Sequence, residues 1–113
     1  MLITFKSNKL QNIFASQREL IRVYGEVRGK KLQSIVSFLL AAPCLQDVPV
    51  EKPFRRHELS LNRKGQFGVD LPKNYRLIFE PNNKPLPLKK DGGLDLKKIT
   101  EIKIIEVEDY HGD

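Results

Sequence analysis

The chain has 113 residues, of which 40% are hydrophobic and 30% charged, so a disordered chain is excluded and a single domain over residues 1–113 is expected. No apolar run reaches the roughly 20 residues of a membrane-spanning helix, and the N-terminus lacks the features of a secretory signal, so we expect a cytoplasmic protein. The one cysteine, Cys44, excludes an internal disulfide bond and agrees with a reducing compartment.

The formal net charge is +6, and it is distributed unevenly along the chain. Residues 99–113 contain one lysine and five acidic residues, a net of −4, so residues 1–98 carry +10. A basic body indicates a polyanionic partner, and nucleic acid is the commonest such partner inside a cell. A basic surface that serves only solubility is the alternative, and charge alone does not decide between the two.

A short apolar segment and a capped helix open the chain. Residues 2–5 are suited to an edge strand. Ser16 is followed three residues later by Glu19, which is a capping box, so a helix is expected to begin at about Gln17. Gly25 is placed to end this helix, because glycine readily adopts the backbone conformation found just past a helix end.

A second helix is expected from about Glu26 to Ala41. Its apolar residues recur at i, i+3, i+4 and i+7, which defines one buried stripe made of Leu32, Ile35, Val36 and Leu39. Pro43 disfavours a helical residue before it and so closes the helix. The two helices and the short link between them are predicted to form a helical hairpin.

The second half of the chain changes to the two-residue period of strands. We expect strands at residues 57–61, 66–71, 75–80 and 99–107. The last of these is apolar in both phases, which indicates burial on both faces of a sheet. Residues 81–98 combine prolines, glycines and lysines and are predicted to form a long loop.

These elements predict an α+β fold, in which an N-terminal helical hairpin packs on one face of a mainly antiparallel sheet of about four strands. Within residues 75–80, Tyr75, Leu77 and Phe79 share one face of the strand and Arg76 lies on the other. If the apolar side chains meet the helices, Arg76 projects from the open face of the sheet.

Few side chains are suited to chemistry. Cys44, His57 and His111 do not form a cluster with metal-ligand spacing, so no metal site is predicted. His57, Arg76, Tyr110 and His111 supply what RNA cleavage without a metal needs: groups that exchange protons, and a cation for the phosphate. Structural or solvated histidines are the commoner alternative, so this inventory alone does not decide the function.

The order and spacing of several short motifs resemble the HigB toxins, the plasmid maintenance system killer proteins of the RelE/ParE superfamily. The similar motifs are His57-Glu58-Leu59, the basic turn at residues 62–67, Asn74-Tyr75-Arg76 with residues 77–81, and the ending at residues 106–111. The helical segment over residues 19–43 is similar too, so the resemblance covers nearly the whole chain. It implies a RelE-like fold.

The resemblance also implies an activity and a set of partners. A HigB-like toxin enters the ribosomal A site and cuts mRNA there without a metal or other cofactor, which inhibits translation. The implied partners are the ribosome with its rRNA, the mRNA, and a cognate antitoxin of the HigA type with a helix-turn-helix domain. Operator DNA is then bound only through the complex with the antitoxin.

Position by position, the resemblance implies a catalytic set of His57, Arg76, Asp109, Tyr110 and His111. Arg76 matches the arginine that contacts the scissile phosphate. His57, Tyr110 and His111 share the proton transfers, in an order that stays open. Asp109 orients a neighbouring residue or binds RNA.

Three basic residues of the turns are expected to bind RNA: Arg63, Lys64 and Lys73. Many relatives have Lys-Gly where this chain has Ser60-Leu61, so a phosphate contact made by that lysine has to come from Arg63 or Lys64 here. The loop at residues 81–98 is longer than in the smallest relatives, and it is either a solvated hairpin extension or a contact for antitoxin or rRNA.

Two other functions stay open. A ParE-like toxin that inhibits gyrase has the same fold and no nuclease activity, but it has no evident need for the ending Asp109-Tyr110-His111. A catalytically inactive module for binding or repression is the other, and the departure at Ser60-Leu61 keeps it in consideration.

Overall fold

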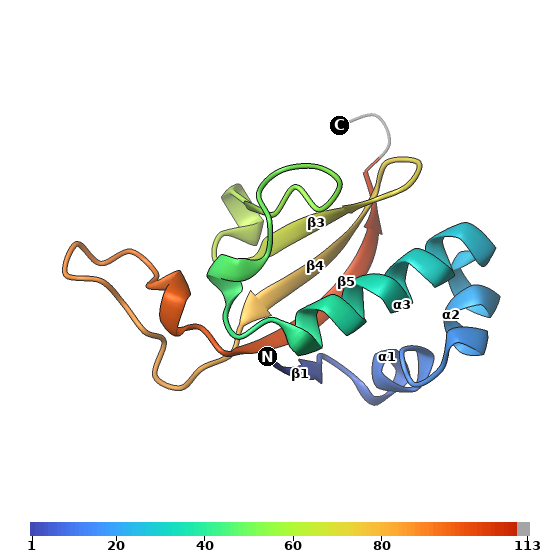
Figure 1. Ribbon diagram of the computed structural model, residues 1–113, viewed down its shortest axis with the longest axis horizontal. Coiled ribbons are helices and arrows are strands. Elements are labelled where there is room, and N and C mark those ends of the chain that lie inside the picture. The colour runs from blue at the N-terminus through green and yellow to red at the C-terminus, as the bar shows by residue number, and fades with distance from the viewer. Residues whose placement is uncertain (111–113) are drawn as a thin grey trace.

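The computed structural model describes residues 1–110, which form a five-stranded sheet with three α-helices on one of its faces (Figure 1). The elements in chain order are β1 (Leu2–Phe5), α1 (Asn8–Ile13), α2 (Gln17–Tyr24), α3 (Glu26–Ala41), β2 (His57–Glu58), β3 (Phe67–Leu71), β4 (Tyr75–Pro81) and β5 (Glu101–Asp109). The α+β class expected from the sequence is confirmed.

Local signals in the sequence place α2 and α3 where they were expected. The side chain of Ser16 accepts a hydrogen bond from the backbone N–H of Glu19 at 3.2 Å, so α2 begins one residue after Ser16. Gly25, with a φ of +87°, ends α2 and directly precedes α3. Gly29 lets these helices cross closely, because a Cβ atom there would lie 2.7 Å from the backbone of Ile21.

The sheet has the strand order β1-β5-β4-β3-β2, in which β1 is parallel to β5 and the other neighbours are antiparallel. The sheet is mainly antiparallel, as expected, and residues 2–5 form an edge strand. The described residues form five strands rather than about four, and the pairing of β1 with β5 is parallel. β1 pairs from Leu2↔Glu101 to Phe5↔Ile104, at the other end of the sequence. Because such a pairing joins distant segments, no local pattern indicates it.

Strand β2 is shorter than the predicted segment 57–61. It ends at Glu58, and Leu61 then adopts a φ of +57° at the start of a 3₁₀ turn, Leu61–Arg63. A non-glycine residue with a positive φ does not continue a strand, so the chain turns away from the sheet there. The other predicted strands of the second half are present, with bounds shifted by at most two residues.

The two faces of the sheet differ in character. The face toward the helices carries the main core, to which β4 contributes the fully buried Leu77 and Phe79. On the other face, the described residues form a small apolar cluster of Leu59, Ile78 and Ile105. Arg76 and Glu108 lie opposite each other in β4 and β5. Arg76 therefore lies on the face away from the helices, as the alternation along the strand predicts.

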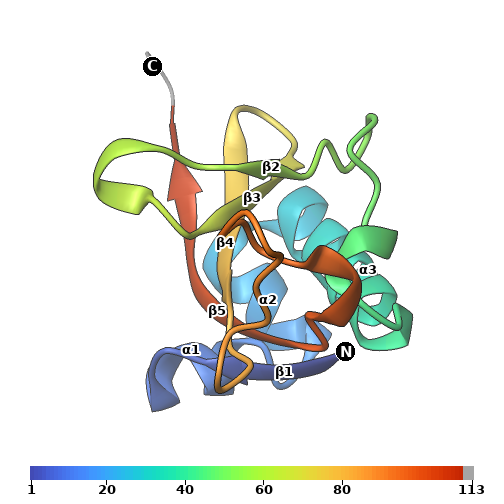
Figure 2. The same ribbon diagram turned by 90° about the vertical axis from the view of Figure 1, so that its left-hand side faces the viewer.

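The segment between β4 and β5 leaves the sheet as an extension, which projects to the left in Figure 1 and faces the viewer in Figure 2. A bridge between Leu88 and Leu94 makes its outer part a small hairpin. At its base, the side chain of Asn83 accepts hydrogen bonds from the backbone N–H groups of Thr100 and Glu101 at 3.0 and 3.1 Å. The base of the extension is therefore clasped where it joins β5.

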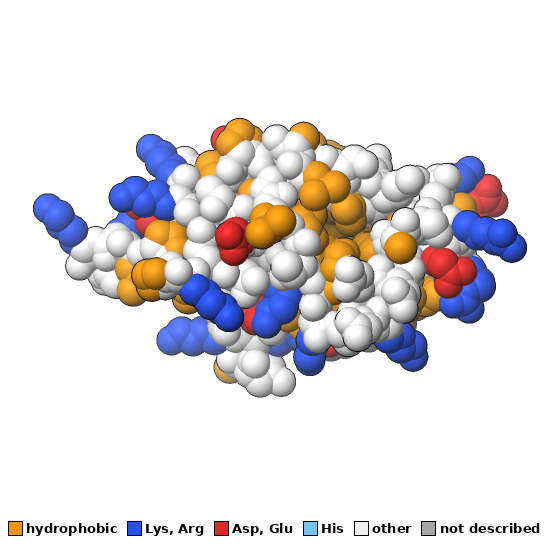
Figure 3. Space-filling model, turned by 90° about the horizontal axis from the view of Figure 1, so that it is seen from below, with side chains coloured by type: hydrophobic (Ala, Val, Ile, Leu, Met, Phe, Trp, Pro, Cys, Tyr) orange, Lys and Arg blue, Asp and Glu red, His pale blue; other side chains and the backbone are white. Residues whose placement is uncertain are grey.

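The side of the molecule that carries α1 and β1 has an apolar middle. Figure 3 shows hydrophobic side chains gathered near the centre of this side, with most lysine and arginine side chains at its margins. The helices expose several apolar side chains, among them Val23, Val27 and Leu40. Within residues 1–110, no helix has the length and apolar character needed to cross a bilayer.

Candidate functional site

A cleft of about 600 Å³ opens on the face of the sheet away from the helices. It is formed by β2, the turn after β2, and the side chains that β4 and β5 present to that face. The lining residues are His57, Glu58, Leu59, Ser60, Leu61, Asn62, Arg63, Arg76 and Glu108. The cleft brings together residues from three separate parts of the sequence, and most of them are polar.

Arg76 is held in this cleft by an acid and by an aromatic ring. Its Nε donates to Oε1 of Glu108 at 2.8 Å, and its Nη2 lies 2.5 Å from the same oxygen. Its guanidinium carbon lies 4.9 Å from the centre of the Tyr110 ring, within the range of a cation–π interaction. The Arg76 side chain is 19% exposed, so it is partly shielded and still reachable from solvent.

Glu108 bridges Arg76 and Arg63. While Oε1 accepts from Arg76, Oε2 accepts from Nη2 of Arg63 at 2.6 Å. Arg63 also lies 3.0 Å from a carboxylate oxygen of Glu106 and donates to the side chain of Gln66. Partial burial raises the pKa of Glu108, but the hydrogen bonds from Arg76 and Arg63 outweigh it, so the pKa lies below its ordinary value. Glu108 is therefore ionised at neutral pH.

Lowering the pH is expected to remove the stabilisation that Glu108 provides. The folded protein holds the pKa of Glu108 below the ordinary 4.5, so the unfolded chain binds this proton more readily. The contribution is complete above the unfolded pKa and is lost as the pH falls through the folded pKa. The urea midpoints of wild type and Glu108→Gln should differ at about pH 7 and converge toward about pH 3.

The control for this titration is Glu80→Gln, which removes one negative charge from β4 at a site paired with Lys103. Its effect on the urea midpoint measures the general cost of losing a carboxylate from the sheet and is subtracted. A difference between wild type and Glu108→Gln that persists unchanged at low pH would contradict the expected ionic origin.

His57 lies beside Arg76, and a glycine makes this possible. His57 pairs with Gly68 of β3, and its Nδ1 lies 2.7 Å from the backbone carbonyl oxygen of Arg55. A carbonyl only accepts, so Nδ1 carries the hydrogen and Nε2 is the proton acceptor of the neutral ring. A Cβ atom on Gly68 would lie 3.4 Å from Nε2 of His57 and 3.6 Å from Cδ of Arg76. Because Gly68 has no side chain, the His57 imidazole and Cδ of Arg76 can both lie over it.

Tyr110 is fixed directly after β5. Its backbone N–H donates to the carbonyl of Asn74 at 3.0 Å, and its hydroxyl lies 3.5 Å from a carboxylate oxygen of Asp70. Asp70 is in turn held by two hydrogen bonds from Arg55, at 2.6 and 2.9 Å. The backbone hydrogen bond to Asn74 thus places the Tyr110 ring against Arg76. The Tyr110 hydroxyl faces the carboxylate of Asp70, which Arg55 holds in place.

Three residues that the sequence analysis did not select hold this site together: Arg55, Asp70 and Glu108. Asp70 and Glu108 are the cross-strand neighbours of Arg76 on either side. Aligning the three strands by register would have found both of them. Arg55 lies in an irregular segment with a φ of +48°, and no sequence pattern indicates its position.

The structure does not bring Asp109 or Lys64 into the cleft. Asp109 is in register with Tyr75, whose side chain packs against the core, so it belongs to the helix side of the sheet. Lys64 lines a different cleft of about 570 Å³, between the turn after β2 and the extension. His111 lies outside the described residues.

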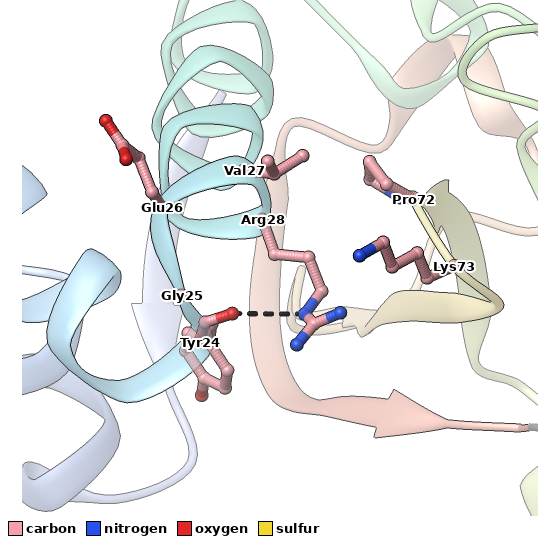
Figure 4. Close-up of a pocket in the computed structure, with 7 residues that line it drawn as sticks. All are labelled: Tyr24, Gly25, Glu26, Val27, Arg28, Pro72 and Lys73. Atoms are coloured by element: carbon pink, nitrogen blue, oxygen red, sulfur yellow. Dashed lines mark hydrogen bonds between the residues drawn. The ribbon is translucent and has the colours of Figure 1, made fainter.

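Lys73 lies in the turn between β3 and β4, on the helix side. It lines a small pocket of about 150 Å³ with Arg28 and Tyr24, at the junction of α2 and α3 (Figure 4). Arg28 donates to the backbone carbonyl of Tyr24 at 3.1 Å and stacks over the Tyr75 ring at 4.0 Å. Lys73 is therefore separated from Arg76 by the sheet.

Of the residues predicted for the site, His57, Arg63, Arg76 and Tyr110 are gathered at or beside the cleft. They combine an imidazole, a phenol and guanidinium groups on an accessible surface. Such groups bind anions and exchange protons. Among residues 1–110, no three His, Cys, Asp or Glu side chains lie together in the manner of metal ligands.

A helical layer on one face of a mixed sheet, with an open polar face behind it, is an α+β fold. A chain of the YoeB–YefM complex from Staphylococcus aureus has a similar fold, with a TM-score of 0.53 and 16% sequence identity over 98% of each chain. At this identity the likeness shows the fold alone. No protein-family model and no curated protein matches the sequence.

Proposed function

We propose that the protein is the toxin of a type II toxin–antitoxin system and acts as a ribosome-dependent endoribonuclease that cuts mRNA without a metal ion. The observation that carries the proposal is the position of Arg76, which lies between His57 and the ring of Tyr110 at an open cleft. The fold supports it, because a chain of the YoeB–YefM complex has a similar one. The motifs that resemble HigB toxins support it independently.

In this reaction the 2′-hydroxyl oxygen of one nucleotide attacks the adjacent phosphorus, and the bond from phosphorus to the next 5′-oxygen breaks. A base accepts the 2′-hydroxyl proton and an acid protonates the leaving oxygen, which yields a 2′,3′-cyclic phosphate and a 5′-hydroxyl end. Arg76 binds the extra negative charge on the phosphate. His57, Tyr110 and His111 share the proton transfers.

The same proposal assigns the remaining predicted residues to RNA contacts. Arg63 lies in the cleft, so it is assigned to a phosphate near the reacting one. Lys64, Lys73 and Asp109 lie outside it and are assigned to more distant RNA or to support of the chain's end. Attraction of the basic body to rRNA is salt-dependent, and the ribosome holds the mRNA in line for attack.

The proposed protein partner is a cognate antitoxin of the HigA type, with operator DNA bound only through that complex. The apolar middle of the side shown in Figure 3 supports a protein partner, because exposed apolar patches mark interaction sites. A groove of about 300 Å³ between α1 and α2, lined in part by Leu10, Ile13 and Val23, belongs to this apolar surface of the helices.

The test is to incubate the purified protein with mRNA, with and without ribosomes, and to map the new RNA ends. New 5′-hydroxyl ends at codon-linked positions, produced only when ribosomes are present, are the expected result. Breaks in DNA on incubation with gyrase, without new RNA ends, would support a ParE-like toxin instead. If neither occurs, the protein is a binding or repression module.

A further inference from the structure

An acidic residue lies where the proposed function needs positive charge. The cleft is proposed to bind RNA, a polyanion, yet the Glu108 carboxylate lies between the two cleft arginines, with one oxygen on each. Its negative charge repels a phosphate and neutralises part of the attraction from Arg63 and Arg76. A carboxylate in this position weakens RNA binding.

The same contacts give Arg76 one orientation. Both the hydrogen bond and the ion pair to Glu108 use the Nε and Nη2 edge of the guanidinium, so Nη1 is not used in them. The guanidinium carbon also lies over the Tyr110 ring, 4.9 Å from its centre, so the ring restricts its movement on that side. A guanidinium held along one edge presents its remaining donors to the cleft in a defined direction.

Without the carboxylate this order is lost. Arg63 and Arg76 carry like charges, and Glu108 is the group that both of them contact. Removing it leaves two repelling cations. Arg63 keeps Glu106 and Gln66 as partners. Arg76, in contrast, loses the carboxylate that holds its guanidinium and can adopt several rotamers. Binding of a phosphate requires charge, which remains, whereas cleavage requires a guanidinium already placed where charge develops.

We propose that Glu108 is a positioning residue for cleavage: it holds Arg76 in its reactive orientation over Tyr110, at the expense of affinity for RNA. The inference rests on the proposed nuclease function and deepens it. It predicts that loss of the Glu108 charge acts in opposite directions on the two steps. RNA binding becomes tighter, and the rate of cleavage of bound RNA becomes slower.

The experiment measures single-turnover cleavage of ribosome-bound mRNA over a range of toxin concentrations, which separates affinity from the saturated rate. Glu108→Gln should reach half-saturation at a severalfold lower concentration and have a saturated rate lower by about tenfold or more. Glu108→Asp keeps the charge and shortens the reach to the arginines, so its rate should fall with no gain in affinity.

Glu80→Gln is the matched control, because it removes the same charge from a sheet carboxylate that pairs with Lys103 outside the cleft. Its saturated rate should equal that of the wild type. A second measurement does not depend on cleavage: the Nε–H resonance of Arg76 in NMR spectra, assigned by its absence from Arg76→Lys. It should be protected from exchange in the wild type and exposed in Glu108→Gln.

The outcomes separate the two proposals. If the wild type cuts no mRNA, the proposed function fails and the positioning role fails with it. If the wild type cuts mRNA and Glu108→Gln cuts at the wild-type saturated rate, only the positioning role is wrong. An equal fall in affinity and rate, or an Arg76 resonance that is unchanged in Glu108→Gln, would also overturn it.

Discussion

Replacing Arg76 with alanine is expected to abolish mRNA cleavage and growth arrest on overexpression while the protein stays folded. In the proposed reaction, the guanidinium stabilises the negative charge that builds up on the phosphate, and removing one such group typically lowers the rate by about two to three powers of ten. The fold should persist, because Arg76 lies on the open face and Glu108 keeps Arg63 as a partner. Saturated cleavage rates with ribosomes measure the loss.

Two further variants define what Arg76 supplies. Arg76→Lys keeps the charge but loses the planar contact along two nitrogens, so it should restore little of the rate. Arg22→Ala removes the same charge from an exposed ion pair on α2 and should leave the rate unchanged. An Arg76→Ala protein that is folded and still arrests growth would remove Arg76 from the proposed chemistry.

Replacing Tyr110 with phenylalanine is expected to lower the cleavage rate by about two to four powers of ten if its hydroxyl takes part in proton transfer. The substitution keeps the aromatic ring that stacks on Arg76 and removes only the hydroxyl near Asp70. Affinity for RNA should therefore change little. Single-turnover cleavage of ribosome-bound mRNA measures both the saturated rate and the half-saturating concentration.

Tyr24→Phe is the control for this substitution. Tyr24 packs against the core, where burial and the nearby charge of Glu106 raise the pKa of its hydroxyl, and it does not line the cleft. Its loss should affect neither the saturated rate nor the half-saturating concentration. Wild-type rates in Tyr110→Phe would leave the proton transfers to His57 and His111 alone.

The sequence predicted the parts of the fold that have local causes. The capping box at Ser16 and the glycine at Gly25 define α2, and alternation along residues 75–80 places Arg76 on the face opposite the core. The parallel pairing of β1 with β5 has no local cause, because it joins the two ends of the described chain.

Strand alternation predicted the position of Arg76 but not that of Asp109, because the last strand is longer than expected. The last strand was expected to end at Val107, which left Asp109 and Tyr110 in one terminal cluster. Strand β5 continues to Asp109, so neighbouring residues point to opposite faces, and Asp109 is directed away from Arg76. Strand alternation over the true length of β5 would have selected Glu108 in its place.

The departure at Ser60-Leu61 also has a structural consequence. Leu61 has a φ of +57°, a backbone conformation that glycine adopts most easily, and its side chain is 90% exposed. The side chain of Leu61 adds an apolar surface to the rim of a cleft whose other lining is mostly polar.

Because the Asn83 side chain ties the base of the extension to β5, the length of the extension can change without affecting the rest of the protein. Because the chain leaves and rejoins the sheet at a tied neck, residues can be inserted or deleted beyond it without shifting the register of β4 and β5. Lengthening such a loop costs little in closure entropy. The hairpin tip near Gly92 is accordingly a natural attachment point for a fluorophore or an affinity tag that leaves the cleft undisturbed.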